Sequence, residues 1–378
     1  MRVGIDASAL LIARKNGYEN YATSLILAMA DLPPKYLTGL DIHLYFYAGN
    51  YLADARLLET YLPKLNGRFK CHVYSPRRGF AAALPLLALR DRLDMLHLPV
   101  HIWAYRFPCK VVATVHDACG LRMFAAGHQF KEVRNLNDSL QKQLKLFQAF
   151  IAVSNSTKQD IVKLYNHPPE QIFVVHHGIN QAFKPDSEMA EKVRLLYNLP
   201  PYILSVNALQ VNKNYKGLLQ AFAKLKQECK DIQALVIVGR KGWGSDTVTA
   251  EIEQLKLNHS VRQLDYIPFD HLRGLYTGAE LVVNASLCEG FGLPVLEALS
   301  CGAKVAVANS TSLPEVGGKA VHYFDPNNPH DIAEKMKQVL TDAHLQTILC
   351  VEAPAHLQTF SWQKAATSTL SVYRKLGG

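Results

Sequence analysis

The chain has 378 residues, of which 49% are hydrophobic and 19% are charged. This length suits two α/β domains, and the composition is not that of a disordered chain. No run approaches the ~18 consecutive apolar residues of a membrane span. The opening MRVGIDASALL does not resemble a secretory signal, because Asp6 interrupts its apolar stretch. Seven scattered cysteines without a CxxC pair argue against a disulfide framework and a zinc site. We expect a cytoplasmic protein.

The positive charge is unevenly distributed. Residues 1–185 hold 22 Lys and Arg against 13 Asp and Glu, whereas residues 186–378 hold 19 of each, so the net charge of +9 lies entirely in the first half. Such asymmetry indicates an anionic partner on that side, either nucleic acid, an acidic polymer or a membrane surface. The stretch 77–93, RRGFAAALPLLALRDRL, alternates arginines with large apolar residues. It fits both a core helix and a helix at the inner face of a membrane, and the sequence leaves both interpretations open.

Short apolar runs typical of strands alternate with helix-like segments along the whole chain. In the first half we expect strands at 2–7, 41–48, 95–99, 110–117, 149–154 and 172–178, and helices such as 18–30 and 131–147. The pattern then restarts, with strands at 202–208, 234–239, 261–267, 280–286, 303–308 and 320–325 and helices such as 216–227. Strands that alternate with helices imply parallel sheets, so the sequence predicts an α/β protein with two doubly wound parallel-sheet domains.

A polar, proline-flanked segment at 179–202 separates the two series of strands. We therefore place a first domain at 1–185 and a second at 186–359. The last stretch, at about 360–378, is predicted to be an amphipathic helix that either caps the second domain or crosses back onto the first.

The segment CEGFGLPVLEALSCG, residues 288–302, combines a glycine-containing loop with the start of a helix. Proline suits a first helical position and glycine suits a helix exit, so we expect a helix from about Pro294 to Ser300 that stops at Gly302. Its N-terminus then faces the carboxyl edge of a parallel sheet, where such folds bind ligands and where backbone amides favour a phosphate. Gly290 and Gly292 would let the backbone approach that ligand.

Two carboxylates, Glu289 and Glu297, flank this expected phosphate site and would repel a phosphate if they pointed at it. They make chemical sense as acceptors for hydroxyl groups on either side of it, with sugar hydroxyls at Glu289 and ribose hydroxyls at Glu297. A nucleotide–diphosphate–sugar has that layout. Two isolated glutamates would more often be ordinary surface acids, so the surrounding motif has to decide.

The motif EGFGLPVLEA resembles the E-x7-E segment of retaining glycosyltransferases of family 4, whose GT-B fold has two Rossmann-like domains facing each other across a cleft. Other segments resemble further parts of that family in the same order, over nearly the whole chain: VGIDASAL…NGYENY, VVATVHD, AVSNSTKQDI, VVHHGINQAFKP, YILSVNALQVNKNYKGLLQAF, LVIVGRKG, LDYIPFDHLRGLYTGAELVVNAS and FSWQKAATSTLSVY. The resemblance implies an N-terminal acceptor-side domain, a C-terminal donor-binding domain and a closing helix that crosses back onto the first domain.

The resemblance also implies roles for individual residues. Glu289 would contact hydroxyls of the donor sugar, Glu297 the nucleotide ribose, and His116 the sugar or the reacting centre. The implied donor-binding residues are Gly17, Lys213, Arg240, Ile267, Glu289, Phe291, Gly292, Leu293 and Glu297. The implied catalytic residues are His116, Lys213 and Glu289.

Two features depart from the family pattern. A lysine at position 213 can reach a diphosphate and offset charge on the leaving group. The arginines that usually accompany this lysine are replaced by Asn212 and Ala208. Fewer positive charges therefore surround the expected diphosphate, or another residue, for example Arg240, supplies them. The usual glycine pair of the first strand–helix turn is reduced to Gly17.

No D-x-D triplet is present, so we expect no metal cofactor. The family implies retention by same-face attack, with the departing phosphate helping to deprotonate the acceptor. We expect a hexose donor, UDP-glucose first and GDP-mannose next, and a saccharide or lipid-linked acceptor in polysaccharide or glycolipid biosynthesis.

Three other functions are compatible with parts of the sequence. A GT-B sugar-nucleotide epimerase would act on the donor without an acceptor. A nucleic-acid or anionic-surface binding protein would use the basic first half, but no helix-turn-helix, RNA-binding or zinc pattern accompanies it, and we expect no nucleic-acid partner. A nicotinamide dehydrogenase is disfavoured, because neither first strand is followed by GxGxxG.

Overall fold

The computed structural model describes residues 1–378 apart from 50–52, 76–79, 101–104, 126 and 128–130. The chain forms two compact units, Met1–Gly178 with Phe360–Gly378, and Ile179–Thr359. Residues 179–185, which the sequence assigns to the first domain, belong to the second unit. There Phe183 is buried, and its ring lies 4.9 Å from that of Phe269 and 5.9 Å from that of Tyr276.

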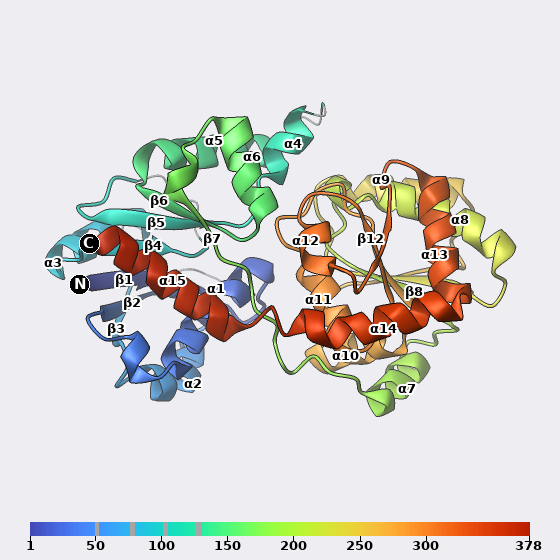
Figure 1. Cartoon of the computed structure of the whole chain (residues 1–378), viewed down its shortest axis with the longest axis horizontal. Coiled ribbons are helices and arrows are strands. Elements are labelled where there is room, and N and C mark those ends of the chain that lie inside the picture. Colours follow the sequence, from blue (N-terminus) through green and yellow to red (C-terminus); the bar gives the residue numbers. More distant parts are fainter. Residues whose placement is uncertain (50–52, 76–79, 101–104, 126, 128–130) are drawn as a thin grey trace. The chain divides into compact units, whose positions relative to one another are not determined.

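A seven-stranded parallel sheet forms the centre of the first unit (Figure 1). In spatial order its strands are β3 (Lys70–Tyr74), β2 (Asp41–Tyr47), β1 (Arg2–Asp6), β4 (Met95–Leu98), β5 (Lys110–Val115), β6 (Ala149–Ala152) and β7 (Ile172–Val174). The sequence did not predict β3. This strand lies at the edge of the sheet and has no fully buried residue, so it lacks the apolar run that marks the other strands.

Helices cover both faces of this sheet. They are α1 (Gly17–Asp31), α2 (Arg56–Leu65), α3 (Phe80–Arg90), α4 (Cys119–Ala125), α5 (Lys131–Leu146), α6 (Asn155–Tyr165) and α15 (Trp362–Gly377). Buried side chains of α1, α2 and α15 form one core with the sheet, whereas those of α3, α5 and α6 form a second core. The two cores explain why the strands are apolar on both faces, as expected for a parallel sheet.

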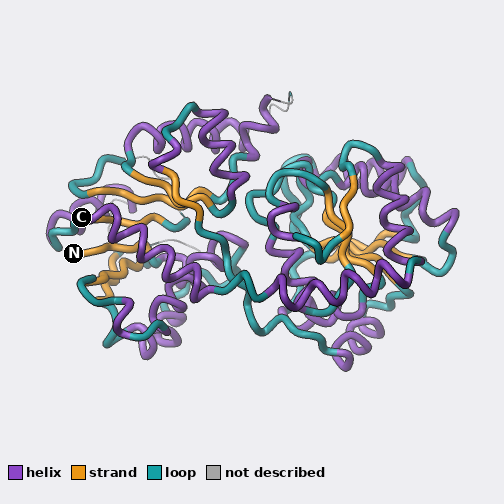
Figure 2. The backbone as a smooth tube through the Cα atoms, viewed as in Figure 1, coloured by secondary structure: helices purple, strands orange, loops and turns teal. Residues whose placement is uncertain are grey.

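The second unit repeats this plan with six parallel strands (Figure 2). In spatial order they are β10 (Val261–Leu264), β9 (Ala234–Val238), β8 (Tyr202–Val206), β11 (Leu281–Asn284), β12 (Val305–Ala308) and β13 (His322–Phe324). Its helices are α7 (Ser187–Leu196), α8 (Tyr215–Glu228), α9 (Ser245–Gln254), α10 (Phe269–Gly278), α11 (Leu293–Ser300), α12 (Leu313–Gly317), α13 (Pro329–Thr341) and α14 (Ala343–Leu357). The predicted fold class is confirmed: each unit is a doubly wound, Rossmann-like parallel sheet.

The strand order reverses direction once in each sheet. In the first sheet β1 pairs with both β2 and β4, and in the second β8 pairs with both β9 and β11. In doubly wound folds the loops at such a reversal typically diverge to opposite faces, and ligands bind there at the carboxyl edge. Among the described helices, none has the length and hydropathy needed to cross a membrane.

The closing helix α15 packs in the core of the first unit. Ser361 caps its start by accepting a hydrogen bond from the amide of Lys364 at 3.1 Å. Near its end the fully buried Tyr373 places its hydroxyl 2.6 Å from Nδ1 of His97. The other ring nitrogen of His97 lies 2.8 Å from the hydroxyl of Thr114 on β5. Burial lowers the pKa of His97 to about 3, so a neutral imidazole joins α15 to the sheet.

We expect the change Tyr373→Phe to destabilise the first unit by about 1–3 kcal/mol, because it leaves Nδ1 of His97 buried without its partner. Denaturant unfolding monitored on the first unit's transition measures this loss. Tyr36→Phe, at an exposed tyrosine, is the control and is expected to be nearly neutral. Equal effects of the two changes would contradict the proposed role of the His97–Tyr373 hydrogen bond.

Candidate functional site

Glu289 lies in the loop between β11 and α11, at the carboxyl edge of the second sheet. One of its carboxylate oxygens, Oε2, accepts a hydrogen bond from Nζ of Lys213 at 2.7 Å, and the other, Oε1, lies 2.8 Å from the hydroxyl of Ser286. The side chains of Lys213 and Glu289 are only 13% and 10% exposed, so water screens their charges little. The structure thus brings two of the three predicted catalytic residues together as a shielded ion pair.

The backbone of the same loop is held by the segment that follows β12. The amide of Glu289 donates to the hydroxyl of Thr311 at 2.9 Å, while the hydroxyl of Ser312 lies 3.0 Å from the carbonyl of Glu289 and 2.8 Å from that of Phe291. The sequence did not predict a role for these hydroxyl residues. The polar run NSTS, residues 309–312, directly follows an apolar strand. All parallel strands end at the same edge of the sheet, so this run could have indicated polar groups near the loop of Glu289.

Gly292 marks the turn from this loop into α11. Its φ of +108° is a conformation that side chains disfavour, and a Cβ here would lie 2.9 Å from Cδ2 of Leu313. The helix begins at Leu293, one residue before the predicted start, and no side chain caps that end among the described residues. It ends as predicted, with Gly302 at φ +77°. The uncapped helix N-terminus and its dipole favour an anionic group beside the loop.

Glu297 lies on α11, where its carboxyl is half-buried. Oε2 accepts a hydrogen bond of 2.9 Å from the hydroxyl of the fully buried Tyr276 on α10. Burial raises the pKa of Glu297 to about 7, although the hydrogen bond from Tyr276 opposes this shift. The tyrosine fixes one oxygen of the carboxyl, which leaves acceptor capacity for a further hydroxyl group.

The residues that replace the expected arginines have a clear structural place. Asn212 is buried, its side-chain NH₂ donates to the backbone carbonyl of Cys288 at 3.3 Å, and its backbone carbonyl accepts from the amide of Leu287 at 2.8 Å. It therefore fastens the lysine-bearing segment to the loop of Glu289 and adds no charge. Ala208 lies in the turn after β8.

Arg240 and Ile267 lie in the loops after β9 and β10, at the same edge of the sheet. The exposed Arg240 places its guanidinium 5.8 Å from the ring centre of Tyr266. Its carbonyl accepts a hydrogen bond from the amide of Leu209, which joins this loop to the turn that holds Ala208. Ile267 is half-buried and precedes Pro268, the N-cap of α10.

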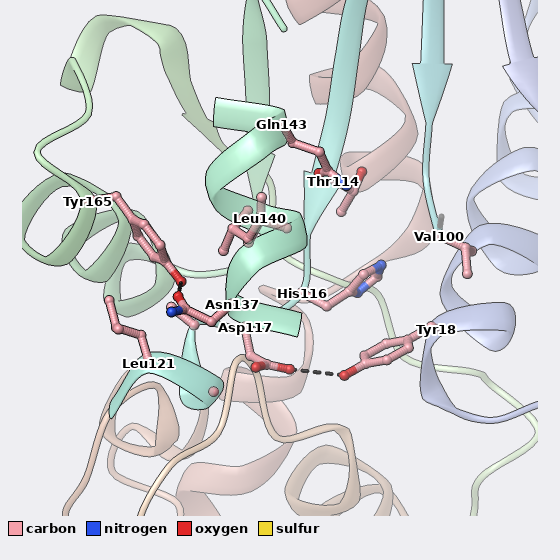
Figure 3. Close-up of a pocket in the computed structure, with 13 residues that line it drawn as sticks. Tyr18, Val100, Thr114, His116, Asp117, Leu121, Asn137, Leu140, Gln143 and Tyr165 are labelled. Carbon is pink, nitrogen blue, oxygen red and sulfur yellow. Dashed lines mark hydrogen bonds between the residues drawn. The ribbon is translucent and has the colours of Figure 1, made fainter. Parts of the chain in front are cut away.

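In the first unit, His116 lies in a pocket at the carboxyl end of β5 (Figure 3). Its Nε2 lies 2.8 Å from the carbonyl of Pro99, and the ring of Tyr18 is 4.7 Å away between centroids. Burial lowers the pKa of His116 to about 4, so the imidazole is neutral near pH 7. A neutral ring that donates from Nε2 keeps a lone pair on Nδ1 for a ligand hydroxyl.

Polar groups from three further segments line this pocket (Figure 3). The hydroxyl of Tyr18 donates to Asp117 at 2.9 Å, and that of Tyr165 donates to Asn137 at 2.6 Å. Asp117 also accepts from the amide of Cys119 at 3.0 Å, which ties the start of α4 to the end of β5. The pocket therefore offers hydroxyl, carboxylate and amide groups to a polar ligand.

Gly17 begins α1 beside the same pocket residue Tyr18. Asn16 caps this helix by accepting from the amides of Tyr18 and Glu19. A Cβ added at Gly17 would meet nothing within 4 Å, so the fold itself does not require glycine there.

Two parallel α/β sheets, with a glycine loop, an uncapped helix N-terminus and a lysine–glutamate pair at one reversal of strand order, match the arrangement expected of a glycosyltransferase of the GT-B type. The chain belongs to this group of enzymes by sequence as well. Residues 186–353 match the family model of glycosyl transferases group 1, and residues 15–183 match that of glycosyltransferase family 4.

Similar proteins include O-antigen chain mannosyltransferase B of Escherichia coli, which is 32% identical over 297 residues, 76% of each chain. The serotype-specific mannosyltransferase WbdA of Escherichia coli is 29% identical over 288 residues, which cover 73% of this chain and 35% of WbdA. Among solved structures, Anabaena HepE in complex with UDP and glucose aligns with a TM-score of 0.71 over 99% of both chains at 18% identity. That last likeness shows the fold.

The two glycines are expected to respond differently to alanine. Gly292→Ala should disturb the loop and destabilise the second unit, because of its positive φ and the nearby Leu313. Gly17→Ala should leave stability unchanged within about 0.5 kcal/mol. If Gly17 allows a ligand to approach the backbone, this variant still loses activity, mainly through a higher KM for the ligand. Thermal unfolding and steady-state kinetics of both variants measure these effects, and a fully active Gly17→Ala enzyme would remove Gly17 from the site.

Proposed function

We propose that the protein transfers a mannosyl group from GDP-mannose to a saccharide or lipid-linked acceptor, with retention of configuration, in polysaccharide or glycolipid biosynthesis. The observation that carries this proposal is the shielded pair of Lys213 and Glu289 beside the N-terminus of α11. Two relatives are named mannosyltransferases, which favours GDP-mannose as the first donor. UDP-glucose, the donor expected from the sequence, becomes the second candidate. It is supported by a protein of the same fold that was solved in complex with UDP-glucose.

The second unit would bind the donor along the carboxyl edge of its sheet. The diphosphate would lie at the N-terminus of α11, near the backbone of Phe291, Gly292 and Leu293. Glu289 would accept hydrogen bonds from the sugar and Glu297 from the ribose. Lys213 neutralises Glu289 in the structure, and donor binding would let this lysine share its charge with the phosphate.

Lys213 would act on the leaving group. As the bond between the anomeric carbon and the phosphate oxygen breaks, negative charge grows on the nucleoside diphosphate, and a nearby cation stabilises it. The acceptor oxygen would form the new bond to the anomeric carbon on the same face and give its proton to the departing phosphate. Glu289 accepts hydrogen bonds at both oxygens. This suits a group that positions the sugar better than a covalent nucleophile.

The pocket of the first unit would bind a sugar. Its neutral His116 and the hydroxyl and carboxylate groups around it match the many hydroxyls of a saccharide. An apolar lining with a few polar groups is typical of small-molecule sites.

Removal of either member of the ion pair is expected to lower kcat/KM by ~10²–10³, because a preorganised charge contact at the reacting centre is lost. Lys213→Ala and Glu289→Ala also each leave a poorly screened charge without its partner, which costs about 3–5 kcal/mol of stability. The double variant should therefore be more stable than either single variant but no more active. Steady-state kinetics with thermal unfolding test this, with Lys216→Ala at a neighbouring exposed lysine as the control. A Lys213→Ala enzyme with nearly full activity would refute the proposed role of Lys213 at the leaving group.

A donor screen tests the reaction itself. Nucleotide release and sugar incorporation are measured with GDP-mannose and UDP-glucose, with and without a saccharide acceptor, and in excess chelator. We expect acceptor-dependent release of GDP that survives the chelator, because Lys213 and the helix N-terminus replace a metal at the leaving group. Release without acceptor would indicate the epimerase alternative. Loss of activity in chelator that magnesium or manganese restores would refute metal independence.

We further propose a weak peripheral contact between the first unit and an anionic membrane leaflet or lipid-linked acceptor. Helix α3 buries Leu84 but exposes Leu86 and Leu89, at 66% and 62%, next to the exposed Arg90. Apolar side chains flanked by cations are typical of interfacial helices. Two further arginines of this stretch, Arg77 and Arg78, lie outside the described residues.

Co-sedimentation with anionic and neutral liposomes tests this contact. Each basic residue near an anionic surface contributes about 1 kcal/mol, so binding should be salt-sensitive and restricted to anionic vesicles. Changing Arg77, Arg78, Arg90 and Arg92 to Glu should abolish it. Changing the exposed Arg194 and Arg262 of the second unit to Glu should not. Equal binding to both vesicle types would exclude an electrostatic contact.

A further inference from the structure

Two histidines and an aspartate meet at the outer edge of the first sheet, among residues that the proposed transfer reaction does not use. His43 lies on β2, His72 on the edge strand β3, and Asp91 directly after α3. Their potential ligand atoms all lie within 4.8 Å of one another, and they are the one group of three or more such residues found among the described part of the chain. His43 is buried, whereas the other two are half-buried.

We propose that His43, His72 and Asp91 form a zinc-binding site that joins the edge strand β3 to β2 and to the end of α3. Nδ1 of His43 lies 3.1 Å from Nε2 of His72. Two zinc–nitrogen bonds of about 2.1 Å at a tetrahedral angle span about 3.4 Å. To bind one ion, the two nitrogens must give up their mutual hydrogen bond and separate by about 0.3 Å, and both rings must turn so that their lone pairs face the ion.

The sheet register places both histidines on one face. Strands β2 and β3 are parallel, with Tyr45 opposite His72 and His43 opposite Lys70, so His43, Tyr45 and His72 share a face. The ring of His72 stacks on that of Tyr45 at 5.0 Å and 15°. This packing restricts the histidine on the edge strand to the side where His43 lies.

Partners around the three residues resemble the outer shell of a metal site. The second nitrogen of His43, Nε2, lies 3.3 Å from Oδ2 of Asp41. A carboxylate behind a histidine fixes the ring and raises its basicity as a metal ligand. The hydroxyl of Tyr45 donates to Asp91 at 2.6 Å, which orients the third ligand.

Two cations near this group oppose a metal ion: Lys70, whose ammonium donates to Asp41 at 2.8 Å, and Arg90. The guanidinium of Arg90 donates two hydrogen bonds to Asp91, both at 2.8 Å. Together with the hydrogen bond from Tyr45 these occupy three of about four lone-pair sites of the carboxylate. One site remains for a metal, and the affinity is reduced by the neighbouring positive charge. Since Arg90 is exposed, it can be changed without disturbing the core.

Isothermal titration of the full chain with zinc chloride, after removal of bound metals by chelator, tests the proposal. We expect one zinc ion per chain, and His72→Gln and Asp91→Asn should each weaken binding at least about tenfold. His344→Gln, at an exposed histidine of the second unit, should not change it. Zinc should also raise the Tm of the first unit in the wild type and not in His72→Gln. An affinity unchanged in His72→Gln and Asp91→Asn would overturn the site, as would the absence of zinc binding.

A second pair of variants keeps the proposal testable if the ligand variants fold poorly. Arg90→Gln should tighten zinc binding about tenfold, because it frees the carboxylate of Asp91 and removes a cation beside it. Arg56→Gln is the matched control, since Arg56 makes the same two-bond contact with Asp54, which is not a member of the proposed metal-binding group, and is 86% exposed. Equal zinc affinities of these two variants would contradict a site at Asp91.

Discussion

In a parallel sheet all strands deliver their carboxyl ends to the same edge, and the candidate site of this protein depends on that constraint. Lys213 follows β8 and Glu289 follows β11, and these two strands are neighbours in the sheet. The two residues therefore meet although 76 positions separate them in the chain. The reversal of strand order between β8 and its two neighbours sends the loops apart and exposes the N-terminus of α11 at this edge. The same constraint places His116 at the end of β5, in the first unit.

The environment of the ion pair explains why the loop of Glu289 is so extensively bonded. A carboxylate and an ammonium that are both largely removed from water lose much of their hydration, and their attraction compensates only when the geometry is well defined. Hydrogen bonds fix this geometry: the hydroxyl of Ser286 contacts the carboxylate of Glu289, and those of Thr311 and Ser312 contact its backbone. Asn212 bonds the carbonyl of Cys288, next to Glu289. This residue replaces an expected arginine and its charge, and its role in the structure is to hold the loop.

Much of the fold could be predicted because its signals are local. Buried parallel strands read as short apolar runs, and α11 has proline in its first turn and glycine after its last residue. The site loop could be predicted for the same reason, since its glycines and glutamates are contiguous. Strand β3 could not, because an edge strand needs no apolar run. Nor could the hydroxyls of Thr311 and Ser312, whose role arises from a neighbouring strand and not from their own segment.

The sequence by itself determined the two α/β units, the family and the residues that carry its motif, because these follow from periodicity and from contiguous residues. The tertiary structure alone decided how distant residues combine. It paired Lys213 with Glu289 and placed Tyr276 against Glu297, and it raised the pKa of Glu297 while lowering that of His116, since burial depends on what packs around a group. It also gathered His43, His72 and Asp91, because strand register is fixed by the sheet and leaves no pattern in any single segment.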